Sequence, residues 1–262
     1  MKSRLSRINF AFLMIFLSLG GISVRASTDT FDYSVYRKLL EMNVVESGQS
    51  TKVKYAVLKK DPSKLIEFNK SVSAISLSRF KAWPKDEQIA FLINAYNSFT
   101  LQLVVENYPV SSIKKIGGIF GNPWKMKFFQ FLGEESSLDR IEHEILRKDY
   151  KEPRIHFAVN CASIGCPPLQ RVPFEASRLD EQLEMAARHF VNNFSFNKYD
   201  QATNTLHLSS IFKWYGSDFG EEKDLRQFLA QRSNLSQSAK EAILKSSKIS
   251  YLDYDWNLNE VK

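Results

Sequence analysis

DEQIAFLINAYNSFTLQLVVE, residues 86–106, is the stretch that decides the fold. Apolar residues occur on every side of a helix drawn through it, so we predict a buried helix at the centre of the core. Pro109 cannot continue a helix, so the helix should end before it. Asn94 and Asn97, three residues apart, share one face of this helix. Because buried amides need hydrogen-bond partners, we expect both to brace a neighbouring loop or strand.

The segments around this helix predict an α+β fold, with a helix-rich body on a small, mainly antiparallel sheet. A remote likeness to papain-type or transglutaminase-type architecture is a further hypothesis, which rests on the core helix together with the His and Cys residues. The aromatic tail, residues 251–256, is expected to dock on the core. Helices are predicted within 27–50, from about residue 61, and over 138–147, 177–194, 210–215, 221–231 and 237–246. Strands are predicted at 53–57, 124–132 and 154–160, with a hairpin over 196–208.

The first 26 residues have the pattern of a secretory signal peptide. Four basic residues and no acidic residue flank an apolar stretch over residues 8–20, and cleavage is expected after Ala26. The apolar stretch is short and soon followed by Arg25, which argues against a membrane span, although an uncleaved anchor is an alternative. We therefore expect a periplasmic or extracellular protein, with residues 27–262 forming one domain and no transmembrane span after cleavage.

Composition and charge exclude several classes of protein. The 262 residues include 36 Lys+Arg and 29 Asp+Glu, a formal net charge of +7. Four basic residues belong to the predicted signal, so the remaining 32 basic and 29 acidic residues leave a net charge of about +3. This small, mixed charge argues against a nucleic-acid partner. A hydrophobic content of 44% excludes a disordered chain, and two cysteines are too few for a disulfide scaffold.

Five segments, taken in order, closely resemble DUF547, a bacterial domain family of unknown function. The resemblance implies a secreted or envelope protein, without a settled activity, and it extends over nearly all of residues 27–262. In that family the position of Cys161 looks more constant than that of Cys166, and Leu92 stands where the motif commonly has Trp. The segments are AFLINAYN (90–97), SLDRIEH (137–143), PRIHFAVNCASIGCPP (153–168), LSSIFKWY (208–215) and YDW (254–256).

The most reactive combination of residues is Cys161 with a histidine. Cys161 follows the predicted strand 154–160 at a corner rich in small residues, where a side chain can be held at a fixed angle. A thiol nucleophile needs a base that removes its proton, which His143 or His156 could supply. Alternation along the predicted strand would point Cys161 away from His156, so the sequence favours His143 as the base.

A base in turn needs an orienting group, and the reaction needs an oxyanion site. Asp139, Glu142 or an asparagine could orient His143, and Asn94 or Asn97 could serve as orienter or oxyanion donor. Backbone N–H groups of residues 162–165 are further candidate donors. The leading hypothesis is thus an exported thiol-dependent hydrolase or acyltransferase acting on a peptide-like or envelope substrate. No cofactor is predicted, and the sequence does not indicate an oligomeric state.

The two cysteines have three other interpretations. An oxidising compartment would preserve a Cys161–Cys166 disulfide, and an oxidised sulfur cannot act as a nucleophile. The thiols could instead be buried and inert. His156, Cys161 and Cys166, with His143, could also bind zinc, but their spacing is unusual for zinc and we predict no metal. A non-catalytic envelope binding or scaffold domain with the disulfide is therefore the alternative function.

Large aromatic residues offer a second candidate site. Trp124, Trp214, Tyr215 and Trp256 could line a groove for a peptide or glycan, but packing in and around the core is the interpretation we favour. Paired carboxylates for glycoside hydrolysis are not singled out, because nothing sets the spacing of the acidic residues near the C-terminus.

Overall fold

The structure is a computed structural model that describes residues 30–118, 121–245 and 247–262. The predicted signal peptide, residues 1–26, lies outside the described residues. Within the described ranges, none of the helices combines the length and apolarity that crossing a membrane requires.

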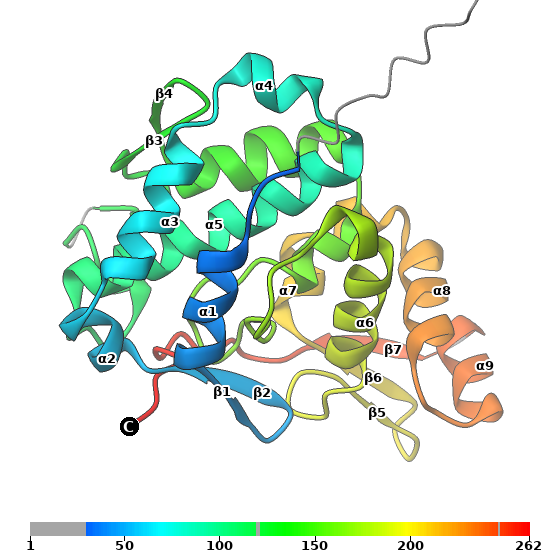
Figure 1. Ribbon diagram of the computed structural model, residues 1–262. Helices are drawn as coiled ribbons and strands as arrows, with labels where there is room; N and C mark the ends of the chain where they lie inside the picture. Colours follow the sequence, from blue (N-terminus) through cyan, green and yellow to red (C-terminus); the bar gives the residue numbers. More distant parts are fainter. Residues whose placement is uncertain (1–29, 119–120, 246) are drawn as a thin grey trace, which may run out of the picture.

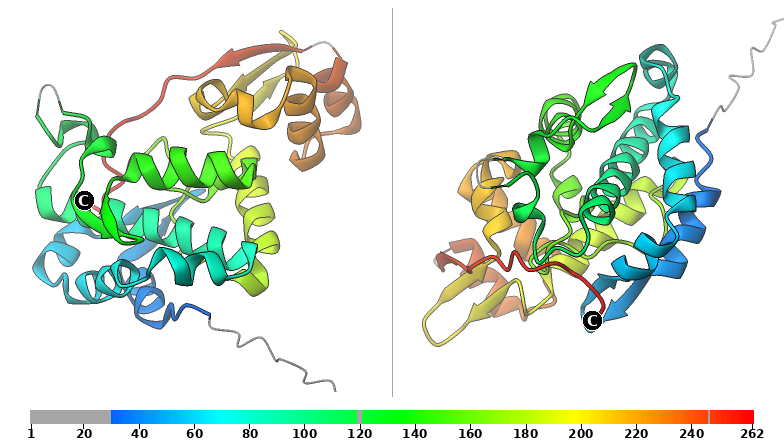
Figure 2. Two further views of the ribbon diagram at one scale, coloured as in Figure 1. Left: turned by 90° about the horizontal axis from the view of Figure 1, so that it is seen from above. Right: turned by 90° about the vertical axis from the view of Figure 1, so that its left-hand side faces the viewer.

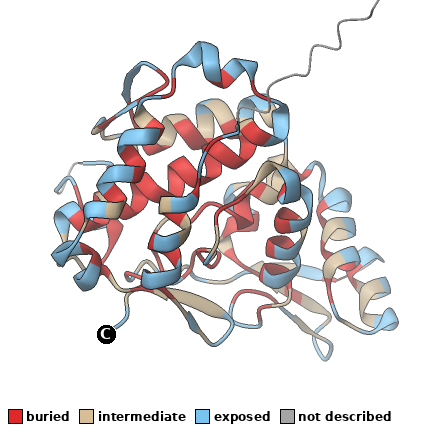
Figure 3. Ribbon diagram, in the orientation of Figure 1, coloured by how far each residue is buried: buried red, intermediate tan, exposed pale blue. Residues whose placement is uncertain are grey.

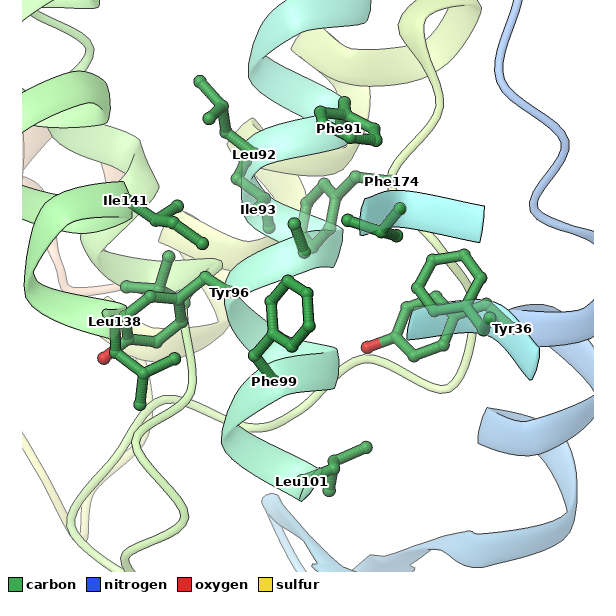
Figure 4. Close-up of a cluster of buried hydrophobic side chains, with 14 of the residues drawn as sticks. Tyr36, Phe91, Leu92, Ile93, Tyr96, Phe99, Leu101, Leu138, Ile141 and Phe174 are labelled. Atoms are coloured by element: carbon green, nitrogen blue, oxygen red, sulfur yellow. The ribbon is translucent and has the colours of Figure 1, made fainter. Parts of the chain in front are cut away.

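Helix α5, Lys85–Asn107, runs through the centre of the molecule (Figure 1). It is buried along most of its length (Figure 3), which confirms the predicted core helix. Its side chains pack in opposite directions, toward Tyr36 and Phe174 on one side and toward Leu138 and Ile141 on the other (Figure 4). The even spread of apolar residues around α5 therefore lets one helix contact elements on all sides.

The N-terminal segment covers one side of α5. It comprises α1 (Ser34–Asn43), β1 (Val44–Ser47), β2 (Ser50–Val53), α2 (Tyr55–Lys60), α3 (Ser63–Ser73) and α4 (Leu77–Ala82). The predicted strand at 53–57 is wrong. Val53 ends an antiparallel hairpin in which it pairs with Val44, and Tyr55 and Leu58 then bury one face of helix α2. A spacing of three residues between two buried side chains fits a helix better than a strand.

The middle of the chain covers the opposite side of α5 with η3, Arg140–Tyr150, a helix with π-type hydrogen bonding (Figure 2, left). This helix confirms the prediction near 138–147. The predicted strand 124–132 is shorter than expected, because Pro123–Lys125 forms the 3-10 turn η2. Strand β3, Phe129–Phe131, pairs with β4, Glu134–Ser136. The remaining elements here are η1 (Ile113–Lys115), η5 (Ala176–Arg178) and α6 (Leu179–Val191).

The predicted strand 154–160 is also wrong, because residues Pro153–Phe157 form the 3-10 helix η4. The Glu152 side chain accepts a hydrogen bond from the Arg154 N–H, and Pro153 stands at the first helical position, so both residues favour a helix start. Ile155, His156 and Phe157 are all buried. The alternation that pointed Cys161 away from His156 therefore does not exist.

In the described residues, the C-terminal region contains a three-stranded sheet and four helices, one of them a short 3-10 helix. β5 (Lys198–Asp200) pairs antiparallel with β6 (Thr205–Leu208), and β6 pairs parallel with β7 (Lys248–Tyr251). The helix-rich α+β prediction is confirmed, with one parallel pair among antiparallel ones. The helix predicted over 177–194 is shorter at its C-terminal end, because α6 ends at Val191 and Phe194 is 70% exposed. The helices are α7 (Ser210–Trp214), η6 (Gly216–Phe219), α8 (Glu222–Arg232) and α9 (Gln237–Lys245).

The C-terminal tail docks on the rest of the chain, as predicted, and runs from β7 back to the N-terminal hairpin (Figure 1; Figure 2, right). The Leu258 N–H donates to the Ser111 carbonyl at 2.9 Å, and the Val53 N–H donates to the Asn259 carbonyl at 2.8 Å. The tail thereby connects two buried apolar clusters, one around α5 and one between α6, α8 and the β5–β6–β7 sheet. Helix η4 lies between these clusters, because Ile155 belongs to the first and Phe157 to the second.

Candidate functional site

A cavity of about 240 Å³ lies where the two apolar clusters meet. Each of the five segments that carry the family resemblance contributes to its wall. The contributing residues include Tyr96, His143, Cys161, Tyr215 and Trp256. Segments far apart in the sequence thus converge on one pocket, which is the candidate site.

The Cys161–Cys166 loop forms one wall of this pocket, and its two cysteines are joined in a disulfide. Cys161 is half-buried, whereas Cys166 is only 3% exposed. The Cys161 N–H donates to the Cys166 Sγ at 2.9 Å, and the Tyr254 Oη lies 3.1 Å from each sulfur. In this state neither sulfur is a thiol, so neither can act as a nucleophile.

The loop is held in shape by groups other than the disulfide. The Asn160 side chain accepts from the Ala162 N–H at 2.9 Å and donates to the Pro167 carbonyl at 2.8 Å. The tail adds hydrogen bonds from the Gly165 N–H to the Asp255 carbonyl and from the Ile164 N–H to the Asn257 carbonyl. Backbone donors of 162–165, expected to bind an oxyanion, are therefore partly occupied by the chain itself.

Glycine is required at position 165 by the tail that crosses it. A Cβ placed there would lie 3.0 Å from ring carbons of Tyr254 and 3.1 Å from the Asp255 backbone nitrogen. Ala162 has a φ of 61°, a left-handed conformation that alanine seldom adopts. The loop thus combines a close approach with an unfavourable backbone conformation on the pocket wall, a combination that is frequent at functional sites.

Asn94 and Asn97 are buried on α5 and bond to backbone groups of the neighbouring loops, as the sequence predicts. Asn94 donates to the Phe174 carbonyl and accepts from the Phe174 N–H. Asn97 donates to the Ala158 carbonyl at 3.0 Å and accepts from the Asn160 N–H at 2.8 Å. Neither amide lines the pocket, and the oxygen and nitrogen of each are engaged, so both brace the structure on which the site is built.

His143 lines the pocket but is directed toward neighbours other than Cys161. Its Nδ1 lies 2.8 Å from Nη1 of Arg147, and its Nε2 is 4.0 Å from the Asp139 carboxylate. Because an arginine can only donate, Nδ1 is the acceptor and its lone pair is occupied. Among the described residues, the Cys161 sulfur is bonded to Cys166 and lies 3.1 Å from the Tyr254 hydroxyl, so no Cys–His pair is formed.

His156 is 2% exposed and is held by a carboxylate that the sequence does not connect to it. Its Nε2 lies 2.7 Å from Oδ2 of Asp218. Arg147 donates one hydrogen bond to each oxygen of the same carboxylate, at 2.6 Å to Oδ2 and 2.8 Å to Oδ1. Burial acts to raise the pKa of Asp218, but the hydrogen bonds from His156 and Arg147 outweigh it and lower this pKa well below its usual range. The Nδ1 of His156 is buried with no partner among the described residues.

Glu142 contributes a buried carboxylate to the pocket wall. It is 4% exposed and accepts a hydrogen bond of 2.9 Å from the Tyr215 hydroxyl. Burial, followed by the charge of Glu142, raises the pKa of both Tyr96 and Tyr215 above the usual value. Both phenols therefore remain protonated and present hydroxyl groups to the carboxylate.

Aromatic rings form the remaining walls. Trp256 lies 4.5 Å from Tyr254, 5.6 Å from Trp214 and 5.8 Å from Trp124, measured between ring centroids. Trp214 is 45% exposed, and its ring lies 4.8 Å from that of Tyr254, so it packs at the edge of the core and also lines the pocket. Trp124 both packs on the α5 cluster and lines the pocket. Tyr254 is the site residue that sequence reasoning missed, because no spacing signal links it to Cys161.

No group of three or more His, Cys, Asp or Glu side chains within the described ranges is arranged to hold a metal ion. The zinc interpretation of His156, Cys161 and Cys166 therefore gains no support, since both sulfurs are in the disulfide.

Comparisons with curated proteins and with solved structures gave no match. A family model described as a protein of unknown function, DUF547, matches residues 80–191. The matched region includes α5, η3, the Cys161–Cys166 loop and α6. Residues 80–191 are therefore similar to DUF547, the family that the motifs resemble.

Proposed function

We propose that this is an exported binding protein whose pocket receives an ammonium group of a peptide-like envelope ligand. The observation that carries the proposal is the chemistry of the pocket lining. Asp139 and Glu142 contribute two carboxylates, and no Lys or Arg is among the described lining residues. The walls also include several aromatic rings, and the face of such a ring attracts cations.

The surroundings of Glu142 and Trp256 support a cationic ligand. Within the described part of the chain, Glu142 accepts its hydrogen bond from Tyr215 and from no cation, and a buried charge is screened less than an exposed one, so a ligand cation would gain from this carboxylate. The chain itself provides a precedent for the aromatic part. Nζ of Lys114 lies 4.7 Å from the centroid of the Trp256 ring, so this indole already stacks with an ammonium group.

The adjoining groove favours a peptide over a simple amine. It shares Tyr254 and Trp256 with the pocket and is lined by Lys114 and Lys115. At about 240 Å³ the pocket is smaller than the ~300 Å³ at which ligand sites usually begin, so it would hold only one end of a ligand. A peptide could place its ammonium group near Glu142 and a carboxylate near the two lysines.

Calorimetric titration of the mature protein, residues 27–262, with short lysine-containing peptides tests this proposal. Binding should weaken at least tenfold when the lysine is acetylated, and by a similar factor in Glu142→Gln, since about 1.4 kcal/mol is a modest value for a desolvated charge pair. Glu144→Gln, an exposed neutral replacement on the same helix, is the matched control. Equal affinity for the acetylated peptide, or no effect of Glu142→Gln, would contradict the proposal.

A thiol-dependent hydrolase or acyltransferase is the second candidate, and the free Nδ1 of His156 favours it. An imidazole oriented by Asp218, with one unpartnered nitrogen, meets the requirement for a general base, and it lines the same pocket as Cys161. His156 would then replace His143 as the base. The disulfide must first be reduced, so ester hydrolysis by the reduced protein that is lost in both Cys161→Ala and His156→Ala would support this activity.

Export is proposed from residues 1–26. Fractionation of the producing cells, followed by N-terminal sequencing of the purified protein, tests it. Protein retained in the cytoplasm with an intact residue 1 would exclude export.

A further inference from the structure

We infer that Cys161 and Cys166 form a redox-active pair that exchanges disulfides with dithiols entering the pocket. This activity goes beyond ligand binding and holds whether or not the pocket takes an ammonium group. It rests on three features of the pair: unequal access to the two sulfurs, hydrogen-bond donors placed on them, and a loop that keeps its shape without the bond.

The two sulfurs are not equivalent toward a reagent. Cys161 is half-buried and Cys166 is 3% exposed, although both contribute to the pocket wall. An incoming thiolate must approach a sulfur from outside the protein, so it reaches Cys161 first and Cys166 becomes the leaving group. A disulfide with one accessible and one covered sulfur therefore reacts in a single direction.

The leaving sulfur is surrounded by donors that stabilise a thiolate. The Cys161 N–H lies 2.9 Å from the Cys166 Sγ, and the Tyr254 hydroxyl lies 3.1 Å from it. Hydrogen bonds to a thiolate make it a better leaving group. The Tyr254 hydroxyl lies at the same distance from the Cys161 Sγ, so it can serve whichever sulfur carries the charge.

The loop does not depend on the bond for its conformation. Asn160 bonds across it to Ala162 and Pro167, and the tail bonds to Ile164 and Gly165. These contacts remain when the sulfur–sulfur bond is broken. The reduced cysteines would stay beside each other, which is the condition for reversible exchange.

The exchange is written with a dithiol as the reductant. One thiolate of the dithiol attacks the Cys161 Sγ, the Cys161–Cys166 bond breaks, and its electron pair leaves on the Cys166 Sγ. The second thiolate of the dithiol then attacks the sulfur already bonded to Cys161, which releases the Cys161 thiolate and a cyclic disulfide. The two protons of the dithiol end on the cysteines, so the protein gains two electrons and the dithiol loses two.

Native reduction by dithiothreitol, followed by thiol counting and circular dichroism, is the first test. The disulfide should open in the folded mature protein without loss of helical signal. Incubation of the oxidised protein with glutathione, acid quenching and peptide mapping should place the adduct on Cys161. Reduction that requires denaturant, or an adduct on Cys166, would overturn the inference.

Substitutions test which of the two sulfurs is attacked and whether the Tyr254 hydroxyl assists the exchange. The single thiol left in Cys166→Ser should react with a chromogenic aromatic disulfide at least about tenfold faster than the one left in Cys161→Ser, because access controls the rate. Tyr254→Phe should slow native reduction at an unchanged melting temperature, whereas Tyr251→Phe, in the exposed part of the same segment, should not. Equal reactivity of the two thiols, or equal rates in the two tyrosine variants, would count against the assigned roles.

Discussion

Two sets of polar side chains are equally buried in this protein but differ in their partners. Asn94 and Asn97 on α5 bond to backbone N–H and carbonyl groups of loops. Glu142 and His156 bond to side chains, Tyr215 and Asp218, and also line a cavity. Burial therefore does not separate bracing residues from candidate functional ones. The kind of hydrogen-bond partner separates the two sets. Side chains that bond to backbone groups fix a loop, whereas a carboxylate that faces a cavity can still accept hydrogen bonds from a ligand.

The largest effect is expected from Asn97→Ala. It would leave the Ala158 carbonyl and the Asn160 N–H buried without their partner, at a cost of about 3 kcal/mol in the free energy of unfolding. Urea unfolding measures this loss. Asn107→Ala is the control on the same helix and should cost less than about 1 kcal/mol, since its amide donates to the Leu103 carbonyl one turn away and, within the described residues, braces no loop. Similar losses in both variants would show that Asn97 does not brace the loops.

A smaller effect is expected when the disulfide is removed. The bond closes a loop of sequence separation 5, so chain entropy gives it about 2 kcal/mol at most, against roughly 4.7 kcal/mol for a 100-residue loop. The double variant Cys161→Ala/Cys166→Ala should therefore remain folded. Urea unfolding of this variant beside the oxidised protein provides the measurement. A loss well above 2 kcal/mol would mean that the loop depends on the bond.

Glu142→Gln should lower the free energy of unfolding less than Asn97→Ala or the double cysteine variant does. The amide oxygen can still accept from the Tyr215 hydroxyl, so the free energy of unfolding should fall by less than about 1 kcal/mol. Glu142→Gln should thus lose ligand affinity while keeping most of its stability. Asn97→Ala should show its main effect on stability. Thermal unfolding and peptide titration on one preparation give both values. A large loss of stability would place Glu142 with the bracing residues.

The smallest effect is expected for Asp218→Asn, which should change how the free energy of unfolding depends on pH. Hydrogen bonds from His156 and Arg147 keep the pKa of Asp218 low in the folded state, whereas an unfolded aspartate titrates near about 3.9. Its stabilisation is therefore complete above pH ~4 and is lost as the pH falls toward the lower folded value. The difference in unfolding free energy between the native protein and Asp218→Asn should shrink between pH 5 and pH 2. A constant difference would mean that the Asp218 charge does not contribute.

Sequence reasoning succeeded for the core and failed for the backbone conformation next to the site. The central helix, the bracing amides and the docked tail follow from composition and spacing alone. The strand predicted at 154–160 failed because Pro153 and the Glu152 cap start a 3-10 helix, and local capping overrides an alternating pattern. That error reversed the choice between histidines, since His156 lines the pocket with Cys161 and His143 is occupied by Arg147.

The sequence by itself determined a buried helix, an α+β class and the two cysteines as the reactive candidates, because apolar periodicity and residue chemistry are local properties. Only the tertiary structure joined Cys161 to Cys166, placed Tyr254 on both sulfurs and set Asp218 beside His156. Each of these contacts, apart from the disulfide itself, links residues more than 60 positions apart. Such contacts depend on how the two apolar clusters and the tail pack together, and residue spacing along the chain does not encode that packing directly.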